Sequence, residues 1–189
     1  DGVWWGTALH AAAARRRVDD VPWLRAHGAA VRCRAAGGNV TPLHCAVSGY
    51  LCHVCVATDE GDASADDAIE NIISALLGSG AEIDARDEGR KTALMLAVEH
   101  CSTACVKLLL ASHADVRACD QRGVNALMLA TLHNWDVIPQ LLEHDVDASA
   151  CDEDGRSALH MALELRPYRV APGDGAIKDV VGSLLDRGA

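Results

Sequence analysis

The chain has 189 residues, half of them hydrophobic, yet it contains no Phe and only 3% aromatic residues. A core made mainly of Ala, Leu, Val and Cys must be thin, which favours closely packed small helices over a broad sandwich or barrel. The net charge of −10 argues against nucleic-acid binding, because that function usually requires a concentrated basic face.

The sequence also argues against membrane insertion and secretion. No apolar run approaches the roughly 20 residues that a membrane-spanning helix needs, and residues 1–6 lack the basic-then-apolar order of a signal peptide. The 8 cysteines are scattered among apolar positions and do not form the framework of a small secreted scaffold. We therefore expect an intracellular, cytoplasmic protein with reduced thiols.

A four-residue box recurs along the chain. It begins at Thr7, Thr41, Thr92, Asn125 and Ser157, and reads TALH, TPLH, TALM, NALM and SALH. The intervals between these starts are 34, 51, 33 and 32 residues, so three of them lie near 33 and the other contains 18 extra residues. Ser, Thr or Asn at each start is suited to capping a helix, and we expect a short helix after each box.

A second helix is predicted in each repeat, between the helix that follows the box and the start of the next repeat. The apolar positions 69, 72, 73, 76 and 77, and again 177, 180, 181, 184 and 185, follow the i, i+3, i+4, i+7 spacing of one helix face. Gly28, Gly80 and Gly188 then stand where a left-handed helix cap is wanted, and His113 and Asp145 take that place in the third and fourth repeats. Pro22 and Pro139 fall in the first turn of such helices, where proline is tolerated.

The segments after these caps complete the repeat. Residues 80–87 and 114–120 are short polar linkers, and Asp120–Gly123 and Asp152–Gly155 are turn sequences. Asn39 stands in for the turn glycine in the second repeat, and Arg90 in the third, where we expect an altered turn. With these linkers, the boxes and the period near 33 residues, essentially the whole chain resembles the ankyrin-repeat family.

The resemblance implies an all-α ankyrin-repeat solenoid of about five helix-turn-helix repeats with β-hairpin fingers, each repeat stacking on the next. One domain would cover residues 1–189, with repeats near 1–33, 34–84, 85–117, 118–149 and 150–189. Two inter-helix insertions fall at 51–67 and 166–176, and each is either a tolerated surface loop or a specific contact. Neither end shows a polar capping repeat, so we expect a segment of a longer chain or a subunit whose ends are covered.

Family resemblance also assigns roles to side chains. It implies that His10, His44 and His160 hydrogen-bond locally and belong to the scaffold. Binding would use finger tips and exposed positions of the first helices, which here are Trp4, Trp5, Arg15, Ser48, Glu88, Lys91, Glu99, His100, Arg122, Val124, Leu132, His133, Glu153, Arg156 and Glu164.

The cysteines allow a competing hypothesis. Cys52 and Cys55 form a C-x-x-C element, and Cys101 and Cys105 occupy the corresponding helix–helix turn of the next repeat, so four thiols are available for a tetrahedral zinc site. Alternatively, each is a small buried hydrophobe or an ordinary thiol. A disulfide between Cys119 and Cys151 is not expected, because stacked helix layers lie about 8–10 Å apart, beyond the roughly 7 Å Cα limit of a bridge.

We find no Gly-x-Ser-x-Gly, phosphate-binding loop or His-Glu-x-x-His motif, so we predict no catalytic residues and no cofactor. The preferred interpretation is a protein-interaction module, scaffold or architectural subunit of a larger assembly. The alternatives are the substrate-recognition arm of a larger enzyme, such as a ubiquitin ligase, kinase or acyltransferase, and a zinc- or redox-responsive adaptor using Cys52, Cys55, Cys101 and Cys105.

Overall fold

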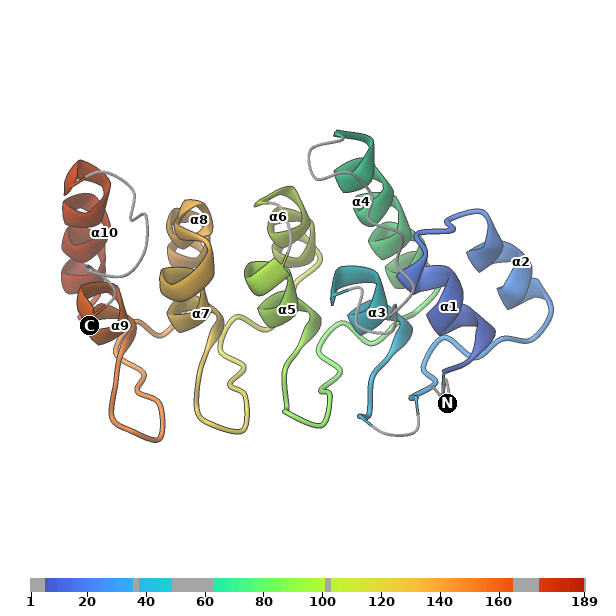
Figure 1. Ribbon diagram of the computed structural model, residues 1–189, viewed down its shortest axis with the longest axis horizontal. Helices are drawn as coiled ribbons and strands as arrows, with labels where there is room; N and C mark the ends of the chain where they lie inside the picture. The colour runs from blue at the N-terminus through green and yellow to red at the C-terminus, as the bar shows by residue number, and fades with distance from the viewer. Residues whose placement is uncertain (1–5, 36–37, 49–62, 101–102, 165–173, 189) are drawn as a thin grey trace. The chain divides into compact units, whose positions relative to one another are not determined.

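The computed structural model describes residues 6–35, 38–48, 63–100, 103–164 and 174–188. Its contacts divide the chain into two compact units, residues 1–114 (unit 1) and residues 115–189 (unit 2). Within the described residues, all regular elements are helices, joined by loops (Figure 1). This confirms the predicted all-α repeat fold.

Unit 1 contains three helix pairs. They are α1 (Ala8–Ala14) with α2 (Asp20–Ala26), α3 (Pro42–Ser48) with α4 (Ala63–Gly78), and α5 (Ala93–His100) with α6 (Thr103–Ala111). The first helices form one layer, in which α3 packs against both α1 and α5, and the second helices form another, in which α4 packs against both α2 and α6. Each pair therefore covers the apolar side of the next.

Unit 2 has the same design. It contains α7 (Ala126–His133), a 3-10 turn η1 (Trp135–Val137), α8 (Ile138–Glu143), α9 (Ala158–Glu164) and α10 (Asp174–Asp186). The first helices α7 and α9 pack together, α8 packs on α7, and α10 packs on α9. Leucines at the third box position fill the cores, since Leu9, Leu43, Leu94 and Leu127 are at most 1% exposed.

The helix caps follow the sequence prediction. Gly28, Gly80 and Gly188 have φ of 88°, 86° and 85°, and His113 and Asp145 adopt 64° and 60° at the equivalent positions. Each second helix thus ends in a left-handed residue that turns the chain into the following loop. His and Asp accept this conformation because their short polar side chains tolerate positive φ better than most residues do.

The loop turn at Arg90 is not altered, contrary to expectation. Arg90 adopts φ of 62°, close to the 78° of Gly123 and the 76° of Gly155. Its N–H donates to the Asp87 carbonyl at 3.0 Å, as the Gly123 N–H does to the Asp120 carbonyl at 3.2 Å. The tight turn is therefore kept at a position where an arginine side chain carries some backbone strain.

The last residues of both predicted insertions are helical, contrary to the expectation of surface loops. Residues 49–62 and 165–173 lie outside the described residues, but α4 begins at Ala63 and α10 at Asp174, so residues 63–67 and 174–176 are helical. The early start of α4 agrees with the alanines at 63 and 65, because alanine has a high helix propensity. None of the helices in the described part has the length and apolar composition needed to cross a bilayer.

Candidate functional site

Histidines of the repeated box tie successive repeats together in unit 1. The Nδ1 atom of His44 accepts from the Thr41 N–H at 3.3 Å and lies 2.7 Å from the Thr41 hydroxyl, while Nε2 reaches the Lys91 carbonyl at 3.1 Å. His10 repeats the arrangement with Thr7 and the Val40 carbonyl at 3.0 Å. Since Nδ1 accepts, the proton sits on Nε2 and is donated to the loop of the next repeat. Both histidines are scaffold residues, as the resemblance implied.

The other boxes depart from this pattern. His160 keeps the local bond, with Nδ1 2.9 Å from the Ser157 hydroxyl, but its ring is exposed, whereas His10 and His44 are 0% and 1% exposed. Met95 and Met128 replace the histidine in two boxes, and Asn125 supplies a different connection by donating from Nδ2 to the Asp147 carbonyl at 3.2 Å. A box can therefore cap its own helix without forming a hydrogen bond to the loop of the next repeat.

Burial of these histidines makes the free energy of unfolding depend on pH. Desolvation lowers the pKa of both His10 and His44 below the ordinary value, while the hydrogen bonds to Val40 and Lys91 oppose it. The unfolded chain therefore binds protons near pH 6.5 before the folded chain does, so stability is full above that pH and falls as the pH drops towards the folded pKa. We expect Tm to decrease between pH 7.5 and 5.5, and to decrease less in the double variant His10→Gln/His44→Gln. Equal slopes for the two proteins in calorimetry would contradict this prediction.

Predicted site residues in the loops of unit 2 converge on one network of charges. Arg122 Nε lies 3.1 Å from Glu153 Oε1 and its NH2 atom 3.8 Å from Asp154 Oδ2, while Arg156 lies 3.0 Å from the same Asp154 oxygen. Arg156 also pairs at 2.9 Å with Asp152, whose side chain is only 1% exposed. The side chains of Arg122, Glu153 and Asp154 are 55–57% exposed, so the network is available to a partner.

A second cluster lies on α5 of unit 1. Lys91 Nζ is 2.5 Å from Glu99 Oε1, and His100 Nε2 is 3.6 Å from the other Glu99 oxygen. The Glu99 side chain is 9% exposed, against 26% for Lys91 and 44% for His100. Three predicted residues from a loop and the end of a first helix therefore meet around one partly shielded carboxylate.

The remaining predicted positions are more scattered. Arg15 and His133 are exposed, Leu132 is half-buried, and the exposed Glu88 donates its N–H to the Gly38 carbonyl at 2.7 Å. Ser48 is half-buried and donates its hydroxyl to the His44 carbonyl. Glu164 is the last residue of α9, and Trp4 and Trp5 lie outside the described residues. Val124 is 8% exposed, so its assignment to the contact surface was wrong, because this position packs inward beside the box.

Sequence reasoning missed two features. Arg32 and Arg117, each four residues after a cap, donate from Nε to the next cap's carbonyl, that of Gly80 in unit 1 and of Asp145 in unit 2, both at 3.2 Å. Both arginines stand four residues after a cap, and this shared spacing in the sequence could have predicted their common role.

Trp23 of α2 is 60% exposed and stacks on His27, with the ring centroids 4.1 Å apart. An exposed Trp is typical of interface anchors.

The zinc hypothesis gains no support from the described residues. Cys52, Cys55 and Cys101 lie outside them, and Cys105 is fully buried in α6. No group of three or more potential metal ligands occurs among the residues that are described. Burial raises the pKa of the Cys45 thiol to about 12, so this cysteine is a small core hydrophobe. Cys119 and Cys151, in successive loops, are not joined by a disulfide.

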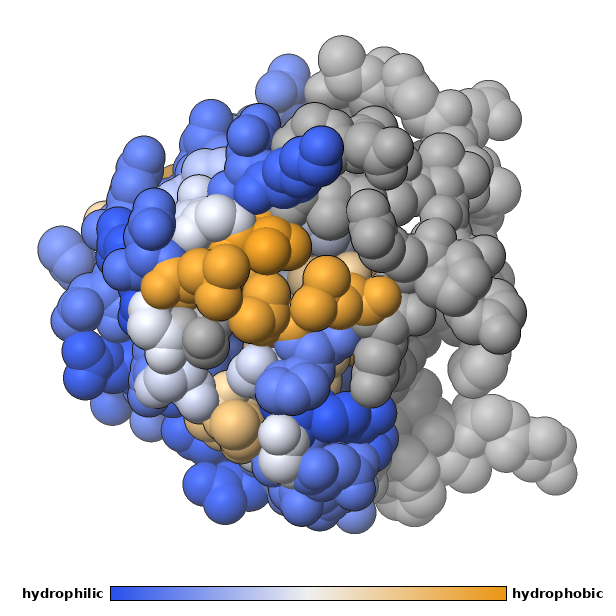
Figure 2. Space-filling view, turned by 90° about the vertical axis from the view of Figure 1, so that its left-hand side faces the viewer, coloured by the Kyte–Doolittle hydropathy of each residue, from blue (hydrophilic) through white to orange (hydrophobic). Residues whose placement is uncertain are grey.

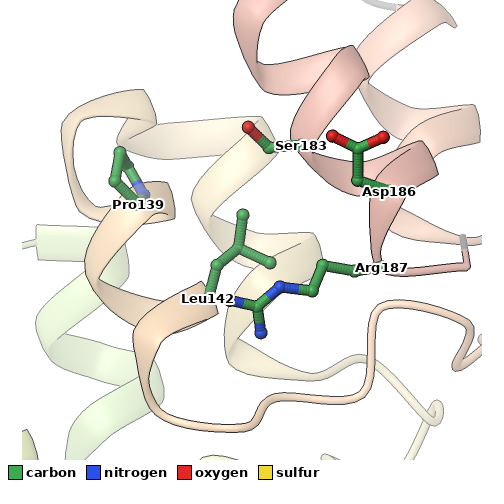
Figure 3. Close-up of a pocket in the computed structure, with 5 residues that line it drawn as sticks. All are labelled: Pro139, Leu142, Ser183, Asp186 and Arg187. Atoms are coloured by element: carbon green, nitrogen blue, oxygen red, sulfur yellow. The ribbon is translucent and has the colours of Figure 1, made fainter.

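A shallow groove lies between α8 and α10 of unit 2 (Figure 3). Its volume is about 280 Å³, and it is lined by Pro139, Leu142, Ser183, Asp186 and Arg187. The Ser183 hydroxyl donates to the Asp179 carbonyl at 2.8 Å, which engages its proton within α10. The groove is a gap between two helices.

Comparison with known proteins is consistent with this geometry. A family model described as ankyrin repeats, in three copies, matches residues 61–148 and again residues 94–173, which together span more than half of the chain. No curated protein sequence matches the chain.

Proposed function

The chain belongs to the ankyrin-repeat family, a family of general protein-interaction modules, and from this premise we propose that it is a scaffold or architectural subunit that binds a protein partner. Binding uses the loop tips and the exposed positions of the first helices. The partner-binding residues are those of the two charged clusters, together with Trp4, Trp5, Arg15, Glu88, Leu132, His133 and Glu164. The chain supplies no catalytic group to the complex.

The observation that carries the proposal is the network on the loop tips of unit 2. Arg122 and Arg156 come from loops one repeat apart, and both reach Asp154. Exposed ion pairs contribute little to stability, about 0–1 kcal/mol each, so the fold gains little from placing the exposed side chains of Arg122, Glu153 and Asp154 here. Arginine is enriched at the energetic centres of protein interfaces, and a mixed set of exposed donors and acceptors favours a polar, charged partner surface over an apolar one.

The architecture that we propose around this surface is five repeats, near 1–33, 34–84, 85–117, 118–149 and 150–189, with the loops acting as β-hairpin fingers. The antiparallel bridges Cys119–Asn125 and Cys151–Ser157 support hairpin-like loops in unit 2. Asp120 and Asp152 support them as well, because each Oδ1 accepts two backbone N–H groups across the turn. A rigid tip of this kind presents side chains at low entropic cost. We further propose that the chain works within a larger protein or a multi-subunit complex.

The experiment compares Arg122→Glu with Lys107→Glu, which makes the same charge change at an exposed position on α6. Proteins captured from native cell lysate by the wild-type chain and by both variants are quantified by mass spectrometry, and the Kd of the main partner is then measured by calorimetry. We expect Arg122→Glu to weaken binding about tenfold or more, because an interface arginine is replaced by a charge of opposite sign. Circular dichroism confirms that both variants are folded.

An unchanged Kd for Arg122→Glu would exclude the loop tips of unit 2 from the interface. Equal losses in the two variants would point instead to a non-specific effect of net charge.

A further inference from the structure

The loop before α5 holds an arginine in a backbone conformation that arginine rarely adopts. Arg90 has φ of 62°, while the equivalent residues of other loops are Asn39, Gly123 and Gly155, with φ of 56°, 78° and 76°. In this left-handed conformation a Cβ crowds the backbone, a cost that glycine avoids and asparagine tolerates. Arginine has neither property, so its side chain makes this turn less stable than the glycine turns of unit 2.

No contact within the described part of the chain offsets this strain. Arg90 is exposed, and its side chain forms no hydrogen bond or ion pair with the residues that are described. Elsewhere in the loops, arginine side chains donate to backbone carbonyls or pair with carboxylates, as do those of Arg32, Arg34, Arg117, Arg122 and Arg156. The guanidinium of Arg90 is therefore available to another molecule.

The charges beside Arg90 restrict the group that it can bind. Glu88, two residues earlier, is exposed, and the neighbouring cation Lys91 is already paired with Glu99 at 2.5 Å. A phosphate carries up to two negative charges, is repelled by nearby acidic side chains and is usually bound by a cluster of arginines. A carboxylate carries one charge, and its two oxygens match the planar pair of N–H groups of a single guanidinium.

On the premise of the proposed protein-binding function, we propose that Arg90 is a specificity-determining residue that binds a carboxylate of an Asp or Glu side chain on the partner. It adds to the partner-binding residues assigned above, which include its neighbours Glu88 and Lys91. Strained backbone is typical of binding sites, where a contact with another molecule offsets its cost. The arginine therefore lowers the stability of the turn and contributes to the affinity of the complex.

The first experiment measures thermal unfolding by calorimetry. Arg90→Gly should raise Tm by about 2–4 °C, because it removes the Cβ from a residue of positive φ. Arg90→Ala keeps the Cβ and should leave Tm within about 1 °C. Gly155→Arg is the reciprocal control and should lower Tm, since the space around its Cβ is open and only the strain is added. An unchanged Tm in Arg90→Gly would remove the strain argument and overturn the proposal.

The second experiment uses phenylglyoxal, which reacts with accessible guanidinium groups, and mass spectrometry of the labelled arginines. Arg90 should react in the free chain and be protected at least fivefold when the chain is incubated with native cell lysate. Arg25 of α2 is the matched control, because it is exposed and its side chain also lacks a polar contact among the described residues. Equal labelling of Arg90 with and without lysate, or equal protection of Arg25, would overturn the proposal.

The third experiment measures the Kd of the main partner that the wild-type chain captures from lysate. Arg90→Ala should weaken binding about tenfold, since it removes a charge-assisted pair of hydrogen bonds, while Arg25→Ala should leave the Kd unchanged. Phosphatase treatment of the partner should preserve this difference. Loss of the difference after that treatment would identify a phosphate as the bound group and overturn the carboxylate assignment.

The same panel separates this inference from the proposed function. A wild-type chain that captures no protein would contradict both, whereas binding weakened by Arg122→Glu but not by Arg90→Ala would contradict this inference alone. An exposed apolar area lies on the side of unit 2 formed by α9 and α10 (Figure 2), and Leu185 of α10 is 55% exposed. Binding lost in Leu185→Glu and kept in Arg90→Ala would assign the partner to that area and overturn the role of Arg90.

Discussion

Replacing His44 with alanine is expected to lower the free energy of unfolding by about 3 kcal/mol or more. The ring is 1% exposed, accepts a hydrogen bond from the Thr41 N–H and reaches the Lys91 carbonyl of the following loop. Its removal leaves those backbone groups without their partner in a buried site and opens a cavity between α3 and the loop before α5. Urea unfolding followed by circular dichroism at 222 nm measures the loss.

His160→Ala is the matched control for that variant. It removes the same side chain from the same box position and the same local bond to Ser157, but His160 is exposed, so the cost should stay below about 1 kcal/mol. Similar losses at the two positions would mean that local capping, and not the connection to the next loop, carries the stabilisation.

Gly123→Ala is expected to destabilise unit 2 by about 2–4 kcal/mol. Part of the cost, about 1–2 kcal/mol, is the penalty for a Cβ at φ of 78°. The rest comes from overpacking, about 1–2 kcal/mol here, because the new Cβ would lie 3.3 Å from Asp152 Cα and 3.4 Å from the Cys151 carbonyl oxygen. These are backbone atoms, which cannot move aside as a flexible side chain would.

Gly155→Ala separates the two contributions. Gly155 has φ of 76° and open space around the new Cβ, so only the conformational penalty applies and the loss should be about 1–2 kcal/mol. Thermal unfolding of both variants gives the difference, which measures how closely the loops pack at Gly123. Equal losses would show that the Cys151–Asp152 backbone yields to the extra methyl group.

Much of the fold could be predicted because every repeat has to meet the same physical requirements, which recur at a fixed spacing in the sequence. Every helix pair must bury an apolar face against the next one, and therefore Leu9, Leu43, Leu94 and Leu127 recur in register. Helix ends recur because the chain must reverse there, and so the caps at Gly28, Gly80 and Gly188 were recognisable. The tolerance of His113 and Asp145 for positive φ followed from the same reasoning.

What could not be predicted depends on contacts between repeats. The start of α4 at Ala63 could not be predicted, because its Asp-, Ser- and Ala-rich sequence is equally typical of exposed turns. Val124 was assigned to the surface because one sequence does not show which neighbour covers a loop residue. The pairing of Arg122 with Glu153 and Asp154 arises only once two loops lie side by side, and the same holds for the difference in exposure between His44 and His160.

The histidine-to-carbonyl bonds of unit 1 all run from an earlier repeat to a later one, and this gives the stack a polarity. In each of these bonds the earlier repeat supplies the imidazole N–H and the later repeat supplies the loop carbonyl. Isologous pairing through α9 and α10 would therefore set donor against donor. Self-association that satisfies these groups must be heterologous, with the imidazole of one copy donating to a loop carbonyl of the other.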